Sequence, residues 1–171
     1  MTGRASFASL LARSGPLLLL LSLLLGLAAC SSGGSPHARH VPPPDSVAAN
    51  NVLMRAIGLV GTPYRYGGNS PEGGFDCSGL VQFVFRDSAG VHLPRSTREL
   101  VAIDAPEVDR DDLQPGDLVF FHPGGGGASH IGIYVGEGRF VHAPSTGGTV
   151  RLDLLDDRYW RAAYAGSRRV L

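Results

Sequence analysis

The sequence reads Phe75-Asp76-Cys77-Ser78-Gly79 immediately before an apolar run, Leu80 to Phe85, that is typical of a helix. This stretch places a cysteine at the start of the predicted helix, where the helix dipole and free backbone N–H groups stabilise a thiolate. The only other cysteine, Cys30, lies in a different kind of segment, so Cys77 is predicted to have no disulfide partner within the chain. We therefore interpret Cys77 as a candidate nucleophile.

A lone cysteine is also commonly a small buried core residue. The neighbours of Cys77 argue against that alternative. Gly73, Gly74 and Gly79 are small enough to let a substrate backbone approach the thiol closely. Asp76 is a charged residue of a kind that core positions rarely carry. The local sequence therefore favours a reactive cysteine.

The remaining patterns indicate helices first and strands later. Helices are expected over residues 46–59, 77–89 and 97–102, with a further helical stretch at 159–164. Strands are expected over residues 118–121, 131–135, 139–143, 149–152 and 167–170. This order predicts an α+β fold in which N-terminal helices pack on an antiparallel sheet.

A β-hairpin is predicted around Gly136-Glu137-Gly138. In its first strand, Ile131 and Ile133 alternate with His130 and Gly132, so the isoleucine face should meet the core and His130 should lie on the opposite face.

The register of this hairpin brings a second histidine to the same face. If the loop has three residues, Val135 pairs with Arg139 and His142 lies opposite Gly132, with His130 as its diagonal neighbour. Diagonal neighbours lie about 7–8 Å apart at Cα, so both imidazoles can reach a common site. The alternative is that both are solvent-facing strand histidines.

These groups suit nucleophilic catalysis. An imidazole beside a thiol can take its proton, and a third polar group must fix the tautomer of that imidazole. We assign Cys77 as the nucleophile, His130 as the base and His142 as the orienting group. The rival is a zinc ion bound by the same three residues, since three protein ligands do form catalytic zinc sites. No CxxC or HExxH pattern occurs, and we expect no metal and no other cofactor.

Residues 1–29 are predicted to be a lipoprotein signal peptide. Two arginines and no acidic residue precede an almost pure leucine run, Leu17 to Leu27. A transmembrane helix is the alternative, but Gly15-Pro16 interrupts the run, which is shorter than the ~20 residues that a span needs. Leu27-Ala28-Ala29-Cys30 resembles a bacterial lipobox, which implies acylation of Cys30. Serine rather than aspartate follows the cysteine, which in Gram-negative lipoproteins implies the periplasmic face of the outer membrane.

Residues 30–45 are predicted to be a flexible tether, and residues 46–171 a single domain of ordinary size. The tether is rich in serine, glycine and proline and cannot bury a core. The whole chain has a net charge of zero, so no basic surface suggests nucleic acid. The chain also contains no lysine, which excludes a Ser–Lys dyad, a Schiff-base lysine and a phosphate-loop lysine.

Six stretches of the domain, in order, resemble the NlpC/p60 family of cell-wall cysteine peptidases. They are Thr62 to Gly68, Phe75 to Val81, Leu93 to Thr97, Gln114 to Phe121, His130 to Tyr134 and Phe140 to Ala143.

The resemblance implies a papain-like fold and cleavage of peptidoglycan stem peptides. The Cys–His–His triad of the family corresponds to Cys77, His130 and His142. It further implies that Tyr64 donates to the developing oxyanion, and that Asp76 and Ser78, which flank the cysteine, hold the substrate's amine.

The expected partners are peptidoglycan stem peptides and, through the lipid anchor, a membrane, with the protein acting as a monomer. The bond expected to be cleaved is the D-Ala–diaminopimelate cross-link, with the D-Glu–diaminopimelate bond as the alternative. A papain-like acyltransferase and a non-catalytic wall-binding lipoprotein are the other classes considered. Arg65 and Arg95 lie near the thiol in sequence motifs, and each is expected to form a structural ion pair, with carboxylate binding as the alternative.

Overall fold

The computed structural model describes residues 46–146 and 148–171. The signal peptide, Cys30 and the tether predicted for residues 1–45 lie outside the described residues. Within the described part of the chain, no helix combines the length and the apolar character needed to cross a membrane.

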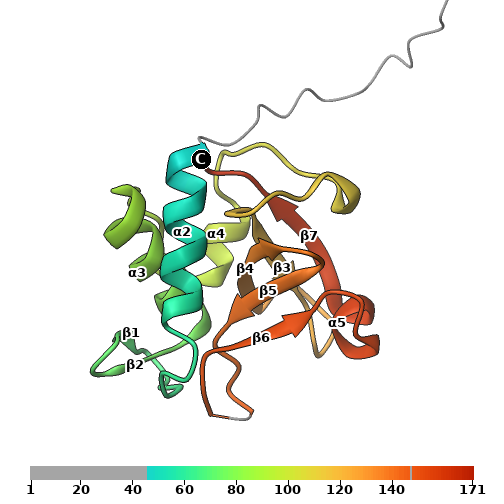
Figure 1. The fold of residues 1–171 in the computed structure, drawn as a ribbon. Helices are drawn as coiled ribbons and strands as arrows, with labels where there is room; N and C mark the ends of the chain where they lie inside the picture. Colours follow the sequence, from blue (N-terminus) through green and yellow to red (C-terminus); the bar gives the residue numbers. More distant parts are fainter. Residues whose placement is uncertain (1–45, 147) are drawn as a thin grey trace, which may run out of the picture. The chain divides into compact units, whose positions relative to one another are not determined.

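The helices come mostly before the strands, which confirms the predicted α+β class (Figure 1). The helices are α2 (Ser46–Gly58), α3 (Cys77–Ala89), α4 (Thr97–Val101), the 3-10 helix η3 (Arg110–Asp112) and α5 (Arg158–Ala163). The strands are β1 (Asn69–Ser70), β2 (Gly74–Phe75), β3 (Leu118–Phe121), β4 (His130–Gly136), β5 (Arg139–His142), β6 (Arg151–Leu154) and β7 (Tyr164–Arg168). Strands β3 to β7 form one antiparallel sheet in the order β6-β5-β4-β3-β7, and β1 and β2 form a separate small hairpin.

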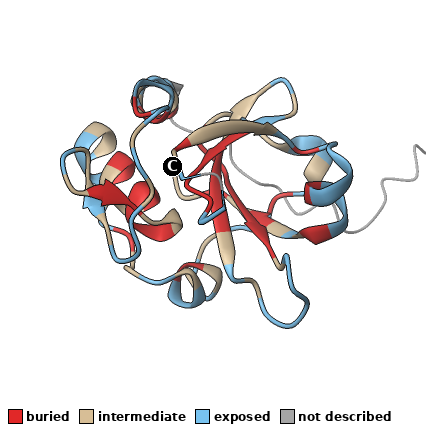
Figure 2. Ribbon diagram, turned by 90° about the horizontal axis from the view of Figure 1, so that it is seen from below, coloured by how far each residue is buried: buried red, intermediate tan, exposed pale blue. Residues whose placement is uncertain are grey.

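The five-stranded sheet is covered on both faces. Ile131 and Ile133 of β4 belong to the core that α2 and α3 share with the sheet, as the alternation of the sequence predicted. On the opposite face, Phe121 and Phe140 pack against Trp160 of α5. Figure 1 shows α2 and α3 on one side of the sheet and α5 on the other, and Figure 2 shows buried residues in the strands and in parts of the helices.

The β4–β5 hairpin keeps its predicted register but has a different turn. Ile133 pairs with Val141 and Tyr134 with Phe140, as expected, whereas Arg139 pairs with Gly136 rather than with Val135. The turn consists of Glu137 and Gly138, whose φ angles of 52° and 68° are those of a two-residue type I′ turn. The predicted three-residue loop is therefore wrong. A bulge between Tyr134 and Gly136 absorbs the extra residue, so the histidine end of the hairpin is unaffected.

Two later strands are displaced from their predicted positions. Strand β6 begins at Arg151 rather than at residue 149 and continues to Leu154, because its pairing with β5 runs from His142↔Arg151 to Arg139↔Leu154. Strand β7 lies at Tyr164–Arg168 rather than at 167–170, because its partner is β3. Pairing with a neighbouring strand, which local propensity does not report, sets both sets of boundaries.

A buried ion pair joins the C-terminal segment to the beginning of β3. Arg169 donates from Nε to Asp117 Oδ1 and from Nη2 to Asp117 Oδ2, both at 2.8 Å, and both side chains are almost entirely buried. This bidentate pair fixes the end of the chain against the sheet.

Candidate active site

Cys77 is the first residue of α3, as the sequence predicted, and Asp76 caps that helix. The Asp76 carboxylate accepts a hydrogen bond of 2.7 Å from the backbone N–H of Gly79. Gly79 also lies against the preceding loop, because a Cβ at this position would be 2.1 Å from the carbonyl oxygen of Gly68. Only glycine fits there, so the loop and the helix that carry the thiol are held tightly together.

The carboxylate of Asp76 is engaged by groups of the protein itself. Arg95 donates to both of its oxygens, from Nη2 at 2.7 Å and from Nη1 at 2.9 Å, which confirms the structural ion pair expected for Arg95. Ser78 Oγ lies 3.2 Å from Asp76 and accepts from Arg95 at 2.8 Å. Burial opposes ionisation of Asp76, but hydrogen bonds from Arg95 and Gly79 hold its pKa below the usual value. The substrate contacts of Asp76 and Ser78 stay predictions.

The thiol of Cys77 lies in a largely buried setting. Its Sγ is 3.7 Å from Thr97 Oγ1, and the backbone of Ile131, next to His130, contributes a further hydrogen bond. Burial raises the pKa of the Cys77 thiol, the charge of Asp76 adds to that effect, and the hydrogen bonds only partly offset it. The expected preference for a thiolate at the helix start is therefore overridden, and the resting thiol is protonated.

Tyr64 lies near the thiol, as the resemblance implied. It is partly buried against the same core as Cys77. Burial raises the pKa of its phenol, and the negative charge of Asp76, together with that of Cys77 once this thiol ionises, adds to the effect. The hydroxyl therefore remains a hydrogen-bond donor throughout the neutral pH range, as a contact to an oxyanion requires.

The two predicted histidines meet directly. His130 Nε2 lies 2.8 Å from His142 Nδ1, and the two rings are nearly perpendicular at 85°. His142 is fully buried, and His130 stacks on Trp160 with ring centroids 5.4 Å apart. The alternative of two solvent-facing strand histidines is therefore wrong, because α5 covers this face of the sheet.

Burial lowers the pKa of both imidazoles. The pKa of His130 falls to about 3, with the neighbouring His142 as the second cause. The pKa of His142 falls to about 4 although Asp153 opposes the shift. Both rings are neutral at physiological pH, so each carries one N–H and one bare ring nitrogen.

Asp153 continues the chain of hydrogen bonds and was missed by the sequence analysis. Its Oδ2 lies 3.0 Å from His142 Nε2. The predicted strand ended at Leu152, which left Asp153 without an assigned face. The sequence carried one signal, the alternation of Arg151 and Asp153 with apolar residues, which places both on one face of a strand. In the structure, the pairing of β5 with β6 brings that face beside His142.

The geometry also bears on the zinc alternative. Among residues 46–146 and 148–171, no group of three or more His, Cys, Asp or Glu side chains is arranged to hold a metal ion. His130 Nε2 and His142 Nδ1 are directed at each other at 2.8 Å, which leaves no space for an ion between them.

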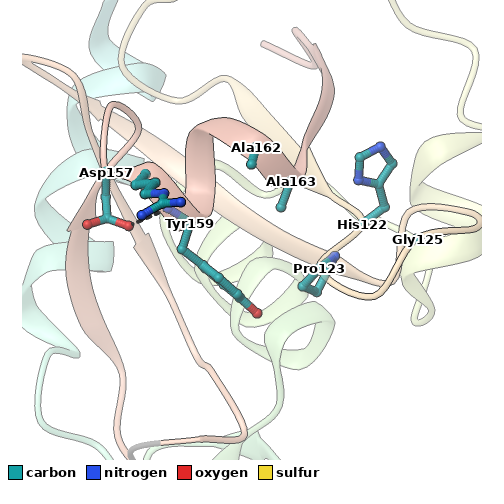
Figure 3. A pocket seen from close by; sticks show the side chains of 8 residues that line it. His122, Pro123, Gly125, Asp157, Tyr159, Ala162 and Ala163 are labelled. Atoms are coloured by element: carbon teal, nitrogen blue, oxygen red, sulfur yellow. Dashed lines mark hydrogen bonds between the residues drawn. The ribbon is translucent and has the colours of Figure 1, made fainter.

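Two hollows adjoin this region. One, of about 380 Å³, is bordered by His130, Arg151, Trp160 and residues 144–146. The other, of about 640 Å³, lies between α5 and the loop that follows β3, and Figure 3 shows Tyr159 reaching across it toward Pro123. Of the two, the smaller hollow is the one bordered by a candidate catalytic residue.

Comparison with known proteins gives consistent matches. The sequence profile of the NlpC/P60 family matches residues 61–169. Murein DD-endopeptidase MepH of Escherichia coli (strain K12) is 41% identical over 137 residues, which cover 79% of this chain and 49% of that protein. Gamma-DL-glutamyl hydrolase of Bacillus subtilis (strain 168) is 40% identical over 133 residues, which cover 77% of this chain and 32% of that protein. The chain thus spans about half the length, or less, of these curated relatives.

A solved structure shares the fold. The crystal structure of a protein described as similar to a lipoprotein of the NLP/P60 family, from Staphylococcus aureus subsp. aureus Mu50, superimposes with a TM-score of 0.67 at 34% identity. The match covers 79% of this chain and 45% of that one.

Proposed function

This chain belongs to the NlpC/P60 family, and we propose that it is a cysteine peptidase that hydrolyses stem peptides of bacterial peptidoglycan. The observation that carries the proposal is the position of the Cys77 thiol, which lies at the start of α3 and beside strand β4. The first residue of β4 is His130, and its Nε2 lies within hydrogen-bond distance, 2.8 Å, of His142 Nδ1. The 41% identity to a murein DD-endopeptidase supports the substrate class.

In the proposed acylation step, His130 removes the proton of the Cys77 thiol as the sulfur attacks the scissile carbonyl carbon. Because thiol and imidazole are both neutral at rest, proton transfer accompanies the attack. The carbonyl oxygen becomes an oxyanion, to which Tyr64 and backbone N–H groups at the start of α3 donate. The C–N bond then breaks as His130 protonates the leaving amine, which leaves a thioester on Cys77.

Water completes the proposed cycle. His130 takes a proton from the water that attacks the thioester, and the C–S bond breaks to release the carboxylic acid, which loses its remaining proton to the solvent. The proton on His130 returns to the Cys77 sulfur, so the resting state is restored. His142 keeps the ring of His130 oriented during both halves of the cycle.

We infer that the cleaved bond is the D-Ala–diaminopimelate cross-link. The leaving amine must receive its proton from His130, and the hollow of about 380 Å³ borders that residue. Arg151 borders this hollow and is 42% exposed although it pairs with Asp153, so its guanidinium can also meet a carboxylate. In the cross-link the leaving amine has a free carboxylate on the adjacent carbon. The identity to a DD-endopeptidase agrees with this choice. The 40% identity to gamma-DL-glutamyl hydrolase favours the D-Glu–diaminopimelate bond as the second candidate.

The test is digestion of a purified cross-linked muropeptide dimer, with products weighed by mass spectrometry. The wild-type protein should release two monomers with intact tetrapeptides, and Cys77→Ala should release none, because it removes the nucleophile. Cys30→Ser is the matched control, since it changes the other cysteine and should leave cleavage intact.

Different products would separate the proposals. Fragments cut after D-Glu would overturn the cross-link assignment in favour of the second bond. Full activity of a folded Cys77→Ala variant would overturn the peptidase proposal itself.

A further inference from the structure

Four nitrogen atoms converge on a single oxygen of Asp153, on the far side of His142 from His130. Trp160 Nε1 lies 2.8 Å from Oδ2, and Arg151 approaches the same atom through Nη2 at 3.0 Å and Nε at 3.2 Å. The fourth contact is His142 Nε2, at 3.0 Å. The carboxylate is only about one-fifth exposed, so these contacts replace most of its hydration.

The chemistry of these partners fixes the direction of every bond. An indole N–H and a guanidinium can only donate, so Oδ2 is an acceptor and His142 Nε2 must carry a hydrogen to approach it. A neutral imidazole has one N–H, so His142 Nδ1 is bare and must accept from His130 Nε2–H. His130 Nδ1 is then also bare, and a bare nitrogen is what a base needs in order to receive a thiol proton.

We propose that Asp153, held by Arg151 and Trp160, is a positioning residue that fixes the tautomers of both His142 and His130, so that His130 presents a bare Nδ1 to the nucleophile. The consequence for catalysis rests on the peptidase function proposed above, whereas the tautomers themselves do not.

Asp153 acts by offering His142 a correctly oriented hydrogen-bond acceptor, and its negative charge is not needed for this. Arg151 lies in contact with the carboxylate and offsets its charge. An asparagine at position 153 would keep its carbonyl oxygen toward Trp160 and Arg151, because its NH₂ group would meet their N–H groups unfavourably. Asp153→Asn therefore retains an acceptor for His142, whereas Asp153→Ala removes it.

The first experiment reads the tautomers directly. Long-range ¹H–¹⁵N NMR of the ring nitrogens, in protein carrying Cys77→Ala to prevent turnover, should show Nε2–H on both His130 and His142. Asp153→Asn should preserve this pattern. Asp153→Ala should give a mixture or the Nδ1–H form at His142. Asp156→Ala is the matched control, because this exposed neighbouring carboxylate pairs with Arg110 and should leave the tautomers unchanged.

The second experiment measures muropeptide cleavage with Cys77 intact. Asp153→Ala should lower kcat by roughly 10²-fold or more with little change in KM, since a wrong tautomer in a serine triad lowers kcat by about 10⁴-fold. Asp153→Asn should stay within about 10-fold of the wild type, because its carbonyl oxygen remains an acceptor for His142. Asp153→Leu, of similar volume and without an acceptor, replaces the alanine variant if that variant does not fold.

Two results would overturn the proposal: a bare Nε2 on His142 in the otherwise wild-type protein, or unchanged tautomers and activity in Asp153→Ala. If the tautomers are as expected but the wild-type protein cuts no muropeptide, the proposed function fails and the assignment of Asp153 as the tautomer-setting group stands.

Discussion

His130 and His142 are uncharged side chains inside the protein, and this state makes stability depend on pH. In the unfolded chain each imidazole takes up a proton near its ordinary pKa of 6.5, whereas in the folded protein the values are about 3 and 4. Below pH 6.5 the unfolded state therefore binds more protons than the folded state, and the free energy of unfolding falls as the pH falls toward 4.

The free energy of unfolding should accordingly decrease between about pH 7 and about pH 5.5, by roughly 1 kcal/mol for each of the two histidines. Urea denaturation at the two pH values measures this change. In a His130→Asn/His142→Asn double variant the decrease should shrink by about 2 kcal/mol. An equal decrease in both proteins would show that the imidazoles are protonated in the folded state.

At the scale of elements, the β4–β5 hairpin brings the histidines together and Gly132 makes their approach possible. A Cβ at Gly132 would lie 2.6 Å from Phe140 Cδ2, 2.9 Å from the carbonyl oxygen of Val141 and 3.3 Å from His142 Cβ. Phe140 is fully buried, so its ring cannot move away freely. A larger residue at position 132 must displace the strand that carries His142.

Gly132→Ala should therefore lower the free energy of unfolding by about 1–3 kcal/mol, as overpacking does. It should also lower kcat for muropeptide cleavage, since small misplacements of catalytic groups strongly reduce rates. Gly127→Ala is the matched control, because nothing lies within 4 Å of a Cβ built there. Thermal or urea unfolding together with the cleavage assay measures both effects. Equal behaviour of the two variants would contradict the close approach seen at Gly132.

At the scale of the whole molecule, the site joins two halves of the domain. The thiol comes from the helical half and the histidines from the sheet, and α3 packs on β4 so that the thiol lies against the backbone of Ile131, next to His130. The buried Arg169–Asp117 pair fixes the end of the chain beside the start of β3, and β7 pairs with β3. The last residues of the sequence therefore hold one edge of the sheet that carries the histidines.

We propose, as the lipobox-like sequence suggested, that residues 1–29 are removed and that acylated Cys30 anchors this domain to the outer membrane. Buried CH₂ groups contribute about 0.8 kcal/mol each, so several acyl chains give a durable anchor. Cys30→Ser should move the protein from the membrane fraction to the soluble fraction of cells. Mass spectrometry of the mature protein checks the modification, and an unmodified Cys30 in membrane-bound protein would contradict the proposal.

The sequence by itself determined the class of fold, the helix that begins at Cys77 and the register at the histidine end of the hairpin. These features depend on signals carried by neighbouring residues: the apolar run after Cys77, and the alternation of Ile131 and Ile133 with His130 and Gly132. Such signals are local because helix and strand periodicity are properties of adjacent residues.

Only the tertiary structure decided the bounds of β6, the role of Asp153 and the neutral state of the site. Strand β6 takes its bounds from β5, and Asp153 acquires its role because α5 brings Trp160 onto the same face of the sheet. The helix start at Cys77 favoured a thiolate, but burial among distant elements outweighed it. Desolvation depends on what covers a group, and segments far apart in the sequence provide that cover.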